Sequence, residues 1–391
     1  MASIHLPHSR LDRRSFLGRG AMFAALAGCS PRMAFAAAET ERRFVFIIQR
    51  GAADGLSILS PTGDPAFARL RAAAAEQGGA RLDGMFSLHA ALPKTAALYR
   101  NGQALFAHAI ASPYRDRSHF DGQNVLETGA ASAFQLRDGW MNRMLGIVPP
   151  ADRSAIAVAA TVPLALRGSH DVASYAPSEL PDASDDLLQR VTMLYQDDAQ
   201  LHALWDEAMQ TRTIAAGLGD GDVKQGAAVG SLAATLLRAD KGARIATVET
   251  SGWDTHFNQE KRLGPVLSGL DAMIDSLRLG LGPVWDQTVV LVATEFGRTA
   301  AVNGTGGTDH GTGAAAMLLG GAVKGGRIIA DWPGLGPSQL YENRDLRPTT
   351  QLDAFIAGAV AQHFGTDPAR TLSTLFPKAS NVRPIEGLIR T

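Results

Sequence analysis

Acidic residues and histidines follow three apolar stretches of the chain, at the point where each stretch ends. Such stretches, rich in β-branched residues and bounded by turn signals, are typical of strands buried on both faces. In an open α/β sheet, reactive groups lie in the crevice outside the carboxyl ends of the strands. The groups in this position are Asp54 after residues 43–49, Asp254 and His256 after residues 244–249, and Glu295, Arg298, Asp309 and His310 after residues 289–294.

The spacing of Asp254 and His256 favours joint ligation of one metal ion. In an extended segment, residues two apart point to the same side, and the preceding strand directs both at the edge of the sheet. The alternative is an Asp that caps a helix and a surface His. His119 and Asp121 have the same two-residue spacing after a further predicted strand at 103–110.

Other residues of the set also have a purely structural interpretation. Asp54 could shape a turn with Gly55, and an ion pair could explain both Glu295 and Arg298 at the end of a buried strand. We expect Asp54, Asp254, His256, Glu295 and His310 to converge, with His119 close by. Carboxylate and imidazole donors without a thiolate favour Zn²⁺, Mn²⁺, Mg²⁺ or Ca²⁺.

A divalent ion in such a site can activate water or an alkoxide and neutralise charge on a phosphoryl or sulfuryl group. Ser118 is the best candidate for a nucleophile among the nearby hydroxyls, because it directly precedes His119 on the loop after the second strand. Arg298 and Arg117 could hold oxyanions with two hydrogen bonds each.

Alternating strands and helices must position these groups. Predicted strands at 43–49, 103–110, 154–159, 243–249, 288–294 and 315–319 alternate with helical segments, including 90–100, 259–279 and 350–364. Residues 162–166 read as a continuation of the third strand, 64–75 as a short helix, and 325–331 as an antiparallel edge strand or hairpin. The pattern predicts one mainly parallel α/β domain over residues 37–391, with a helical insert at about 184–238 covering one side of the sheet.

Composition limits the possible partners. The chain has 391 residues, of which 46% are hydrophobic, and a net charge of −1, so no broad nucleic-acid surface is expected. No run of about 18 uncharged apolar residues occurs, so we expect no transmembrane helix.

The N-terminus has the pattern of a twin-arginine export signal. Arg13 and Arg14 precede Phe16 and Leu17, and a mildly apolar stretch follows. Cleavage after Ala36 fits the small-residue rule and would make residues 1–36 the signal peptide. The segment ending at Cys29, the one cysteine of the chain, also resembles a lipoprotein box, which would make Cys29 a lipid anchor. We therefore expect the export machinery as a partner and a periplasmic or exported location.

These motifs together resemble the exported family called domain of unknown function 1501. The resemblance rests on the leader, Arg50–Leu56, Arg117–Asp121, Gly252–His256, Thr294–Thr299 and Asp309–Gly311. It implies the α/β/α sandwich of the alkaline phosphatase and sulfatase superfamily, with one or two divalent metals. It also implies metal-binding roles for Asp54, Asp254, His256, Glu295 and His310, and places Ser118 near the hydroxyl nucleophile.

The sequence departs from the superfamily's pattern in two places. The usual Asp-x-x-x-His is here Asp254-x-His256, and the usual Asp-His pair is Glu295–Phe296, so one imidazole is missing unless His119 replaces it. Two functions therefore stay open. One is a metal-dependent hydrolase of phosphate or sulfate esters, and the other is an exported binding or assembly protein that retained the fold.

Overall fold

The computed structural model describes residues 42–76, 79–176, 185–195, 226–240, 242–379 and 381–390, with isolated positions between 198 and 209. The predicted signal peptide, with Arg13, Arg14 and Cys29, lies outside the described residues. Within them, no helix is long and apolar enough to cross a membrane.

Three buried parallel strands form the centre of the sheet. β1 (Arg43–Gln49) lies between β8 (Ile245–Thr250) and β9 (Thr288–Thr294). It pairs in parallel with both, so that Gln49 is level with Thr250 and Thr294. Because all three strands run the same way, the segments that follow them meet at one edge, as the sequence predicted.

The sheet extends to both sides of this centre. Among the described residues its order is β11-β5-β10-β9-β1-β8-β6-β7, with β12 pairing beside β5. The outer strands are β5 (Ala104–Ala111), β6 (Ala155–Val158), β7 (Ala173–Ser174), β10 (Ala314–Leu319), β11 (Arg327–Ile329) and β12 (Thr350–Gln351). A separate small sheet contains β2 (Leu59–Ser60), β4 (Ser87–His89) and β3 (Gly79–Arg81).

β10 is the antiparallel strand of the main sheet, pairing antiparallel with β9 and with β5. The predicted strand at 103–110 is therefore in the same sheet as β1 and β9 but not next to either. β11 is an edge strand, as predicted for 325–331, but the predicted antiparallel pairing was wrong, because β11 pairs parallel with β5. The antiparallel step also means that the segment from β9 to β10 leaves and rejoins the sheet at the same edge.

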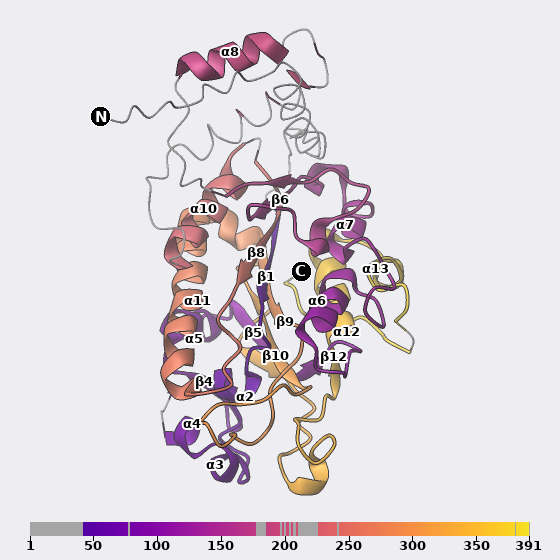
Figure 1. Cartoon of the computed structure of the whole chain (residues 1–391). Coiled ribbons are helices and arrows are strands. Elements are labelled where there is room, and N and C mark those ends of the chain that lie inside the picture. Colours follow the sequence, from indigo (N-terminus) through magenta and orange to yellow (C-terminus); the bar gives the residue numbers. More distant parts are fainter. Residues whose placement is uncertain are drawn as a thin grey trace, which may run out of the picture.

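Helices cover both faces (Figure 1). One layer contains α5 (Pro93–Arg100), α10 (Gly226–Arg238) and α11 (Gln259–Leu281), which pack with Val45 and Ile47 of β1. The other contains α6 (His119–Thr128), α7 (Trp140–Leu145), α12 (Leu352–Phe364) and α13 (Pro368–Leu375), which pack with Phe44 and Phe46. Alternate residues of one strand thus enter two cores. The predicted α/β/α sandwich with a mainly parallel sheet is confirmed.

Several local predictions differ from the structure. Residues 64–75 contain two short helices, α3 (Phe67–Leu70) and α4 (Ala72–Glu76), instead of one, and residues 162–166 contain a 3₁₀ turn instead of a strand. Of the predicted insert, the structure describes α8 (Asp185–Tyr195) and α10, and α10 packs against α11 in the main layer. The remaining elements are α2 (Gly55–Ile58) and the 3₁₀ helices η1 (Pro150–Asp152), η2 (Leu164–Leu166), η3 (Gly282–Gln287) and η4 (Pro337–Gln339).

Candidate metal centre

Three segments bring histidines and an aspartate to the carboxyl edge of the sheet. Asp254 and His256 follow β8, and His119 begins α6 after β5. His310 lies in the connection between β9 and β10, which turns back so that Arg298 and His310 form an antiparallel bridge. Because both ends of this connection are anchored in buried strands, the loop returns its histidine to the place where Asp254 lies.

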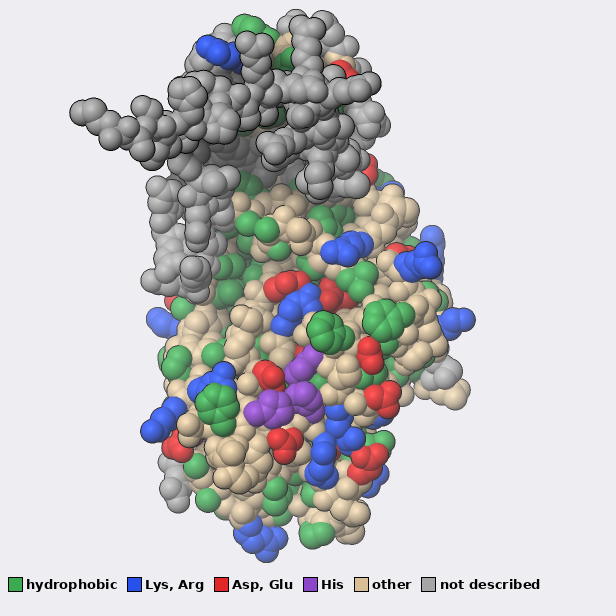
Figure 2. All heavy atoms as spheres, in the orientation of Figure 1, with side chains coloured by type: hydrophobic (Ala, Val, Ile, Leu, Met, Phe, Trp, Pro, Cys, Tyr) green, Lys and Arg blue, Asp and Glu red, His purple; other side chains and the backbone are tan. Residues whose placement is uncertain are grey.

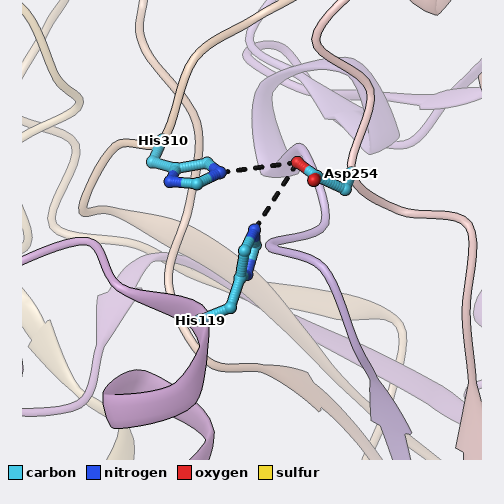
Figure 3. A group of neighbouring side chains, drawn as sticks. All are labelled: His119, Asp254 and His310. Atoms are coloured by element: carbon cyan, nitrogen blue, oxygen red, sulfur yellow. Dashed lines mark ion pairs between the residues drawn. The ribbon is translucent and has the colours of Figure 1, made fainter.

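The donor atoms of these residues meet. Nε2 of His119 lies 3.5 Å from Oδ1 of Asp254, and Nε2 of His310 lies 3.4 Å from it (Figure 3). Donor atoms of these three residues all lie within 4.8 Å of one another. Nε2 of His256 lies 3.0 Å from the same oxygen and 2.9 Å from Nε2 of His310. Ligands about 2.0–2.1 Å from one zinc ion have separations of roughly 3.3 Å. The contacts of Asp254 with the three rings are near this spacing, and His119, Asp254 and His310 are the set whose donor atoms are all mutually close.

The other nitrogen of each ring faces an oxygen acceptor. Nδ1 of His119 lies 2.8 Å from Oε1 of Glu295, and Nδ1 of His256 lies 3.2 Å from Oδ1 of Asp309. Nδ1 of His310 lies 2.9 Å from the carbonyl oxygen of Arg117. A carbonyl can only accept, so it assigns the proton of His310 to Nδ1 and leaves Nε2 as a lone pair. Outer partners of this kind orient metal-binding histidines in known sites.

Three Nε2 atoms lie near one carboxylate oxygen of Asp254, which Arg298 also binds. If all three Nδ1 atoms carry the protons, three Nε2 lone pairs face one carboxylate oxygen. Nε2 of His119 is buried and has no hydrogen-bond partner in the structure. Burial, followed by the charges of His119 and Arg298, lowers the pKa of His310, which favours the neutral form that a metal requires. The residues present therefore fit a divalent cation.

Glu295 lies behind His119 instead of in the cluster itself. Its Oε1 accepts hydrogen bonds from the Gly51 N–H (2.9 Å) and from Gln123 (3.2 Å), in addition to the contact with His119. Burial alone would raise the pKa of Glu295, but the bonds from His119 and Gly51 lower it. The same bond raises the pKa of His119. Glu295, which was predicted as a ligand, therefore contacts His119 from behind and is not one of the donor atoms that meet at Asp254.

Arg298 forms an ion pair with Asp254. Its buried guanidinium binds Asp254 and donates to the carbonyls of Ala52 (2.7 Å), Gly51 (2.7 Å) and Thr308 (3.0 Å). Burial alone would raise the pKa of Asp254, but the Arg298 contact lowers it. Each nitrogen of Arg298 already donates and the side chain is fully buried, so the predicted role of holding a substrate oxyanion does not fit. The predicted pairing of Arg298 with Glu295 is likewise replaced by the pair with Asp254.

Asp54 has its own buried partners. Its two oxygens lie 2.6 and 3.2 Å from the guanidinium of Arg71, and Oδ2 also accepts hydrogen bonds from Ser57 (2.7 Å) and Gln259 (2.5 Å). Burial alone would raise the pKa of Asp54, but Arg71 lowers it. A carboxylate with these partners is satisfied without a metal, so the structure separates Asp54 from the ligand set predicted for it.

Ser118 is the N-cap residue of α6 and directly precedes His119. Its backbone N–H donates to the Tyr114 hydroxyl at 2.9 Å, and its side chain makes no capping hydrogen bond. The Ser118 side chain also contacts the Tyr114 hydroxyl, and within the described part of the chain no contact links it to a histidine or a carboxylate. Arg117, the other predicted oxyanion holder, binds Glu342 at 2.5 Å and Asp345 at 2.8 Å.

Sequence reasoning missed the side chains that form hydrogen bonds with these carboxylates. They are Arg71 and Gln259 around Asp54, and Gln123, which joins Glu295 to Arg50 through hydrogen bonds of 3.2 and 3.0 Å. Gln259 and Asp54, like Gln123 and Glu295, are far apart in sequence, so no local motif pairs them. One signal was available, since a buried carboxylate needs a partner.

The cluster is open to solvent. Figure 2 shows the histidines together on one face, with acidic, basic and hydrophobic side chains beside them. Side-chain exposure is 24% for His119, 26% for His310, 40% for His256 and 47% for Asp254. A metal here would keep a side accessible to a substrate, unlike a closed structural zinc site.

Solved structures resemble the chain only weakly. Ps i-CgsB in complex with k-i-k-neocarrahexaose matches with a TM-score of 0.36 and 9% identity, covering 84% of this chain and 73% of that chain. The C-terminal periplasmic domain of EcEptC from Escherichia coli, in complex with Zn, matches with a TM-score of 0.29 and 9% identity, covering 75% and 74%. Likeness at this level does not indicate a shared substrate or mechanism. Among curated proteins, none matches the chain.

A family match covers most of the described chain. Residues 92–376 match the family described as "Protein of unknown function (DUF1501)". The match includes His119, Asp254, His256 and His310, together with Glu295 behind them. The chain therefore belongs to the DUF1501 family.

Proposed function

We propose that the protein is an exported metal-dependent hydrolase of phosphate or sulfate esters. His119, Asp254, His256 and His310 would hold one divalent ion through three Nε2 atoms and one Oδ1. Three imidazoles and a carboxylate favour zinc or manganese over calcium, which prefers oxygen ligands alone. The ion would neutralise charge on the ester group and activate water.

The protein's own residues orient and stabilise this set. Glu295, Asp309 and the carbonyl of Arg117 fix the three imidazole rings, and Arg298 fixes Asp254. In the reaction, a water oxygen forms a bond to phosphorus or sulfur, the bond to the ester oxygen breaks, and the water's proton goes to the leaving alcohol. The observation that carries the proposal is the convergence of three Nε2 atoms on Oδ1 of Asp254, with the Nδ1 atom of each ring facing an oxygen acceptor.

Metal analysis followed by turnover tests the proposal. The purified protein is stripped with a chelator, reloaded with zinc or manganese, and assayed on 4-nitrophenyl phosphate and 4-nitrophenyl sulfate. We expect about one metal per chain and a turnover that disappears on stripping and returns on reloading. The proposal fails if the protein binds no metal, or if the loaded protein hydrolyses neither ester.

A second candidate function is an exported binding or assembly protein that keeps the metal for structure. It is favoured by the burial of Arg298 and by the absence, among the described residues, of a histidine or carboxylate in contact with the Ser118 hydroxyl, whose neighbour is the Tyr114 hydroxyl. Bound metal without turnover of either ester, combined with a large loss of thermal stability on stripping, would support it. Ser118→Ala should leave metal content unchanged in both cases, and would abolish turnover only if Ser118 is the nucleophile.

We also propose export through the twin-arginine route. The signal is read through both guanidinium groups, so replacing Arg13 and Arg14 with lysine should remove the protein from the periplasm. Mass spectrometry of the mature N-terminus decides between cleavage after Ala36 and a lipidated Cys29. An unchanged periplasmic yield in the double variant would overturn the assignment.

A further inference from the structure

A cavity of about 650 Å³ opens beside the metal centre. This volume is within the range of about 300–1,000 Å³ typical of small-molecule sites. Asp309 and Thr299 belong to its wall. Asp309 also contacts Nδ1 of His256 at 3.2 Å, and its backbone N–H donates to Thr299 at 3.1 Å. The cavity and the candidate metal ligands therefore share the segment between β9 and β10.

The rest of the wall is mainly apolar. Leu70, Leu335, Leu340 and Val302 line it. Leu335 and Leu340 belong to a small hydrophobic core, whereas 45% of the Val302 surface is exposed. The exposed part of this apolar surface makes no contribution to the hydrophobic core. It does suit the non-reacting part of a bound molecule.

The charged side chains of the wall are two arginines, Arg69 and Arg344, and one carboxylate, Asp309, so positive charge is in excess by one. Arg344 has its guanidinium held by Asp345, with Nε 2.8 Å from Oδ1, and by the carbonyl of His310. Arg69 lines the cavity from α3 and is exposed. Within the described ranges it has no ion-pair partner, so its charge is available to a ligand. An exposed arginine can bind a carboxylate with two hydrogen bonds.

We infer that this cavity binds the alcohol part of the ester substrate, and that this part has an apolar body and an anionic group that Arg69 recognises. The inference rests on the proposed function, because the reacting phosphate or sulfate would lie at the metal centre. The apolar body would contact Leu70 and Val302. The protein would then select esters of a carboxylated or otherwise anionic ring or chain over esters of small neutral alcohols.

Three esters separate these contributions: methyl phosphate, phenyl phosphate and 4-carboxyphenyl phosphate, with the matching sulfates as a second arm. We expect Arg69→Gln to raise KM for the carboxylated ester at least tenfold. KM for phenyl phosphate should stay within twofold, and kcat for both should be unchanged. Leu70→Trp, which fills the cavity, should raise KM for both aromatic esters at least tenfold and leave methyl phosphate within twofold.

Matched controls lie elsewhere on the surface. Arg100→Gln removes an exposed charge near the end of α5, and Leu279→Trp enlarges a side chain that is 62% exposed on α11. Neither should change KM for any ester. Metal content and thermal unfolding of all four variants establish that the centre and the fold are intact.

The result separates this inference from the proposed function. If the esters are hydrolysed but Arg69→Gln and Leu70→Trp behave like their controls, the cavity assignment is wrong and the hydrolase stands. If none is hydrolysed, calorimetric titration of the metal-loaded protein with 4-carboxyphenyl phosphate decides. Binding that both variants weaken at least tenfold supports the cavity assignment, whereas absent binding, or binding that neither variant weakens, overturns it.

Discussion

The Nε2 atoms of His256 and His310 lie 2.9 Å apart. The Nδ1 atom of each ring faces an oxygen acceptor, Asp309 for His256 and the Arg117 carbonyl for His310. With the protons on Nδ1, two lone pairs point at each other across this distance. Such an arrangement is stable only with a proton or a cation between the rings.

Removing either ring should therefore reduce metal binding. We expect His256→Ala and His310→Ala each to lower metal content well below one per chain after dialysis, and the double variant to bind almost none. His170→Ala, outside the cluster, is the matched control. Inductively coupled plasma mass spectrometry measures the stoichiometry. A double variant that retains wild-type metal content would disprove the assignment of these ligands.

Glu295→Gln tests a positioning role for Glu295. Glutamine keeps an oxygen for the Nδ1 proton of His119 but removes the negative charge. Loss of an outer partner of this kind typically weakens metal affinity about 10–100-fold. We expect a decrease in this range, measured by competition with a chromophoric chelator, with the stoichiometry unchanged at saturating metal. If Glu295 were itself a ligand, the number of bound ions or the coordination spectrum of a cobalt-substituted protein should change as well.

Much of the framework could be predicted because strands leave a strong local signal. Residues 44–48 and 289–293 are uninterrupted apolar runs, and the strands that contain them extend over 43–49 and 288–294. The spacing of Asp254 and His256 similarly predicted that both would face one point. In each case, backbone geometry alone determines where the side chains go.

The features that could not be predicted from the sequence depend on contacts between distant parts of the chain. No local pattern shows that β10 enters the sheet between β9 and β5, because strand order is decided by how the layers pack. Asp54 and Glu295 follow strands of equal clarity, yet the first meets Arg71 and the second meets His119. A carboxylate near a metal and a carboxylate in an ion pair have the same local sequence signal, so only the fold distinguishes them.

The Asp54–Arg71 ion pair leads to a prediction on stability. Both side chains are 1% exposed, and breaking such a pair from one side typically costs about 3–5 kcal/mol because the other charge stays buried. We expect Asp54→Asn to lower the free energy of unfolding by an amount in this range, measured in urea, with metal stoichiometry unchanged. A loss of metal with little change in stability would return Asp54 to the ligand set.

A further prediction concerns His108, a buried residue of β5 whose side chain contacts β2. Its Nε2 donates to the Leu59 carbonyl at 2.9 Å, and its Nδ1 accepts from the Ala109 N–H at 2.7 Å. The ring therefore has two partners in its neutral form, and protonation of Nδ1 would break one of them. Burial lowers the pKa of His108 to about 4.

Proton binding at His108 determines how the stability of the fold changes with pH. Between pH 4 and the ordinary histidine pKa of about 6.5, the unfolded chain binds a proton at this position and the folded chain does not, so stability falls as the pH falls. The expected slope from this one group is up to about 1.4 kcal/mol per pH unit. Asp353 acts in the opposite direction throughout this window, because burial raises its pKa from 3.8 to about 7.

Comparison with His108→Gln isolates the contribution of His108 from those of Asp353 and the metal-site histidines. Glutamine has an amide N–H and an oxygen for the same two partners but does not titrate. We expect the variant to be less stable than wild type at pH 7, because its side chain fills the space of the ring poorly. The difference should shrink as the pH is lowered from 6.5 to 4.5. Urea unfolding at both values, with the metal removed, measures it, and a difference that does not change with pH would mean that the buried ring is not held neutral.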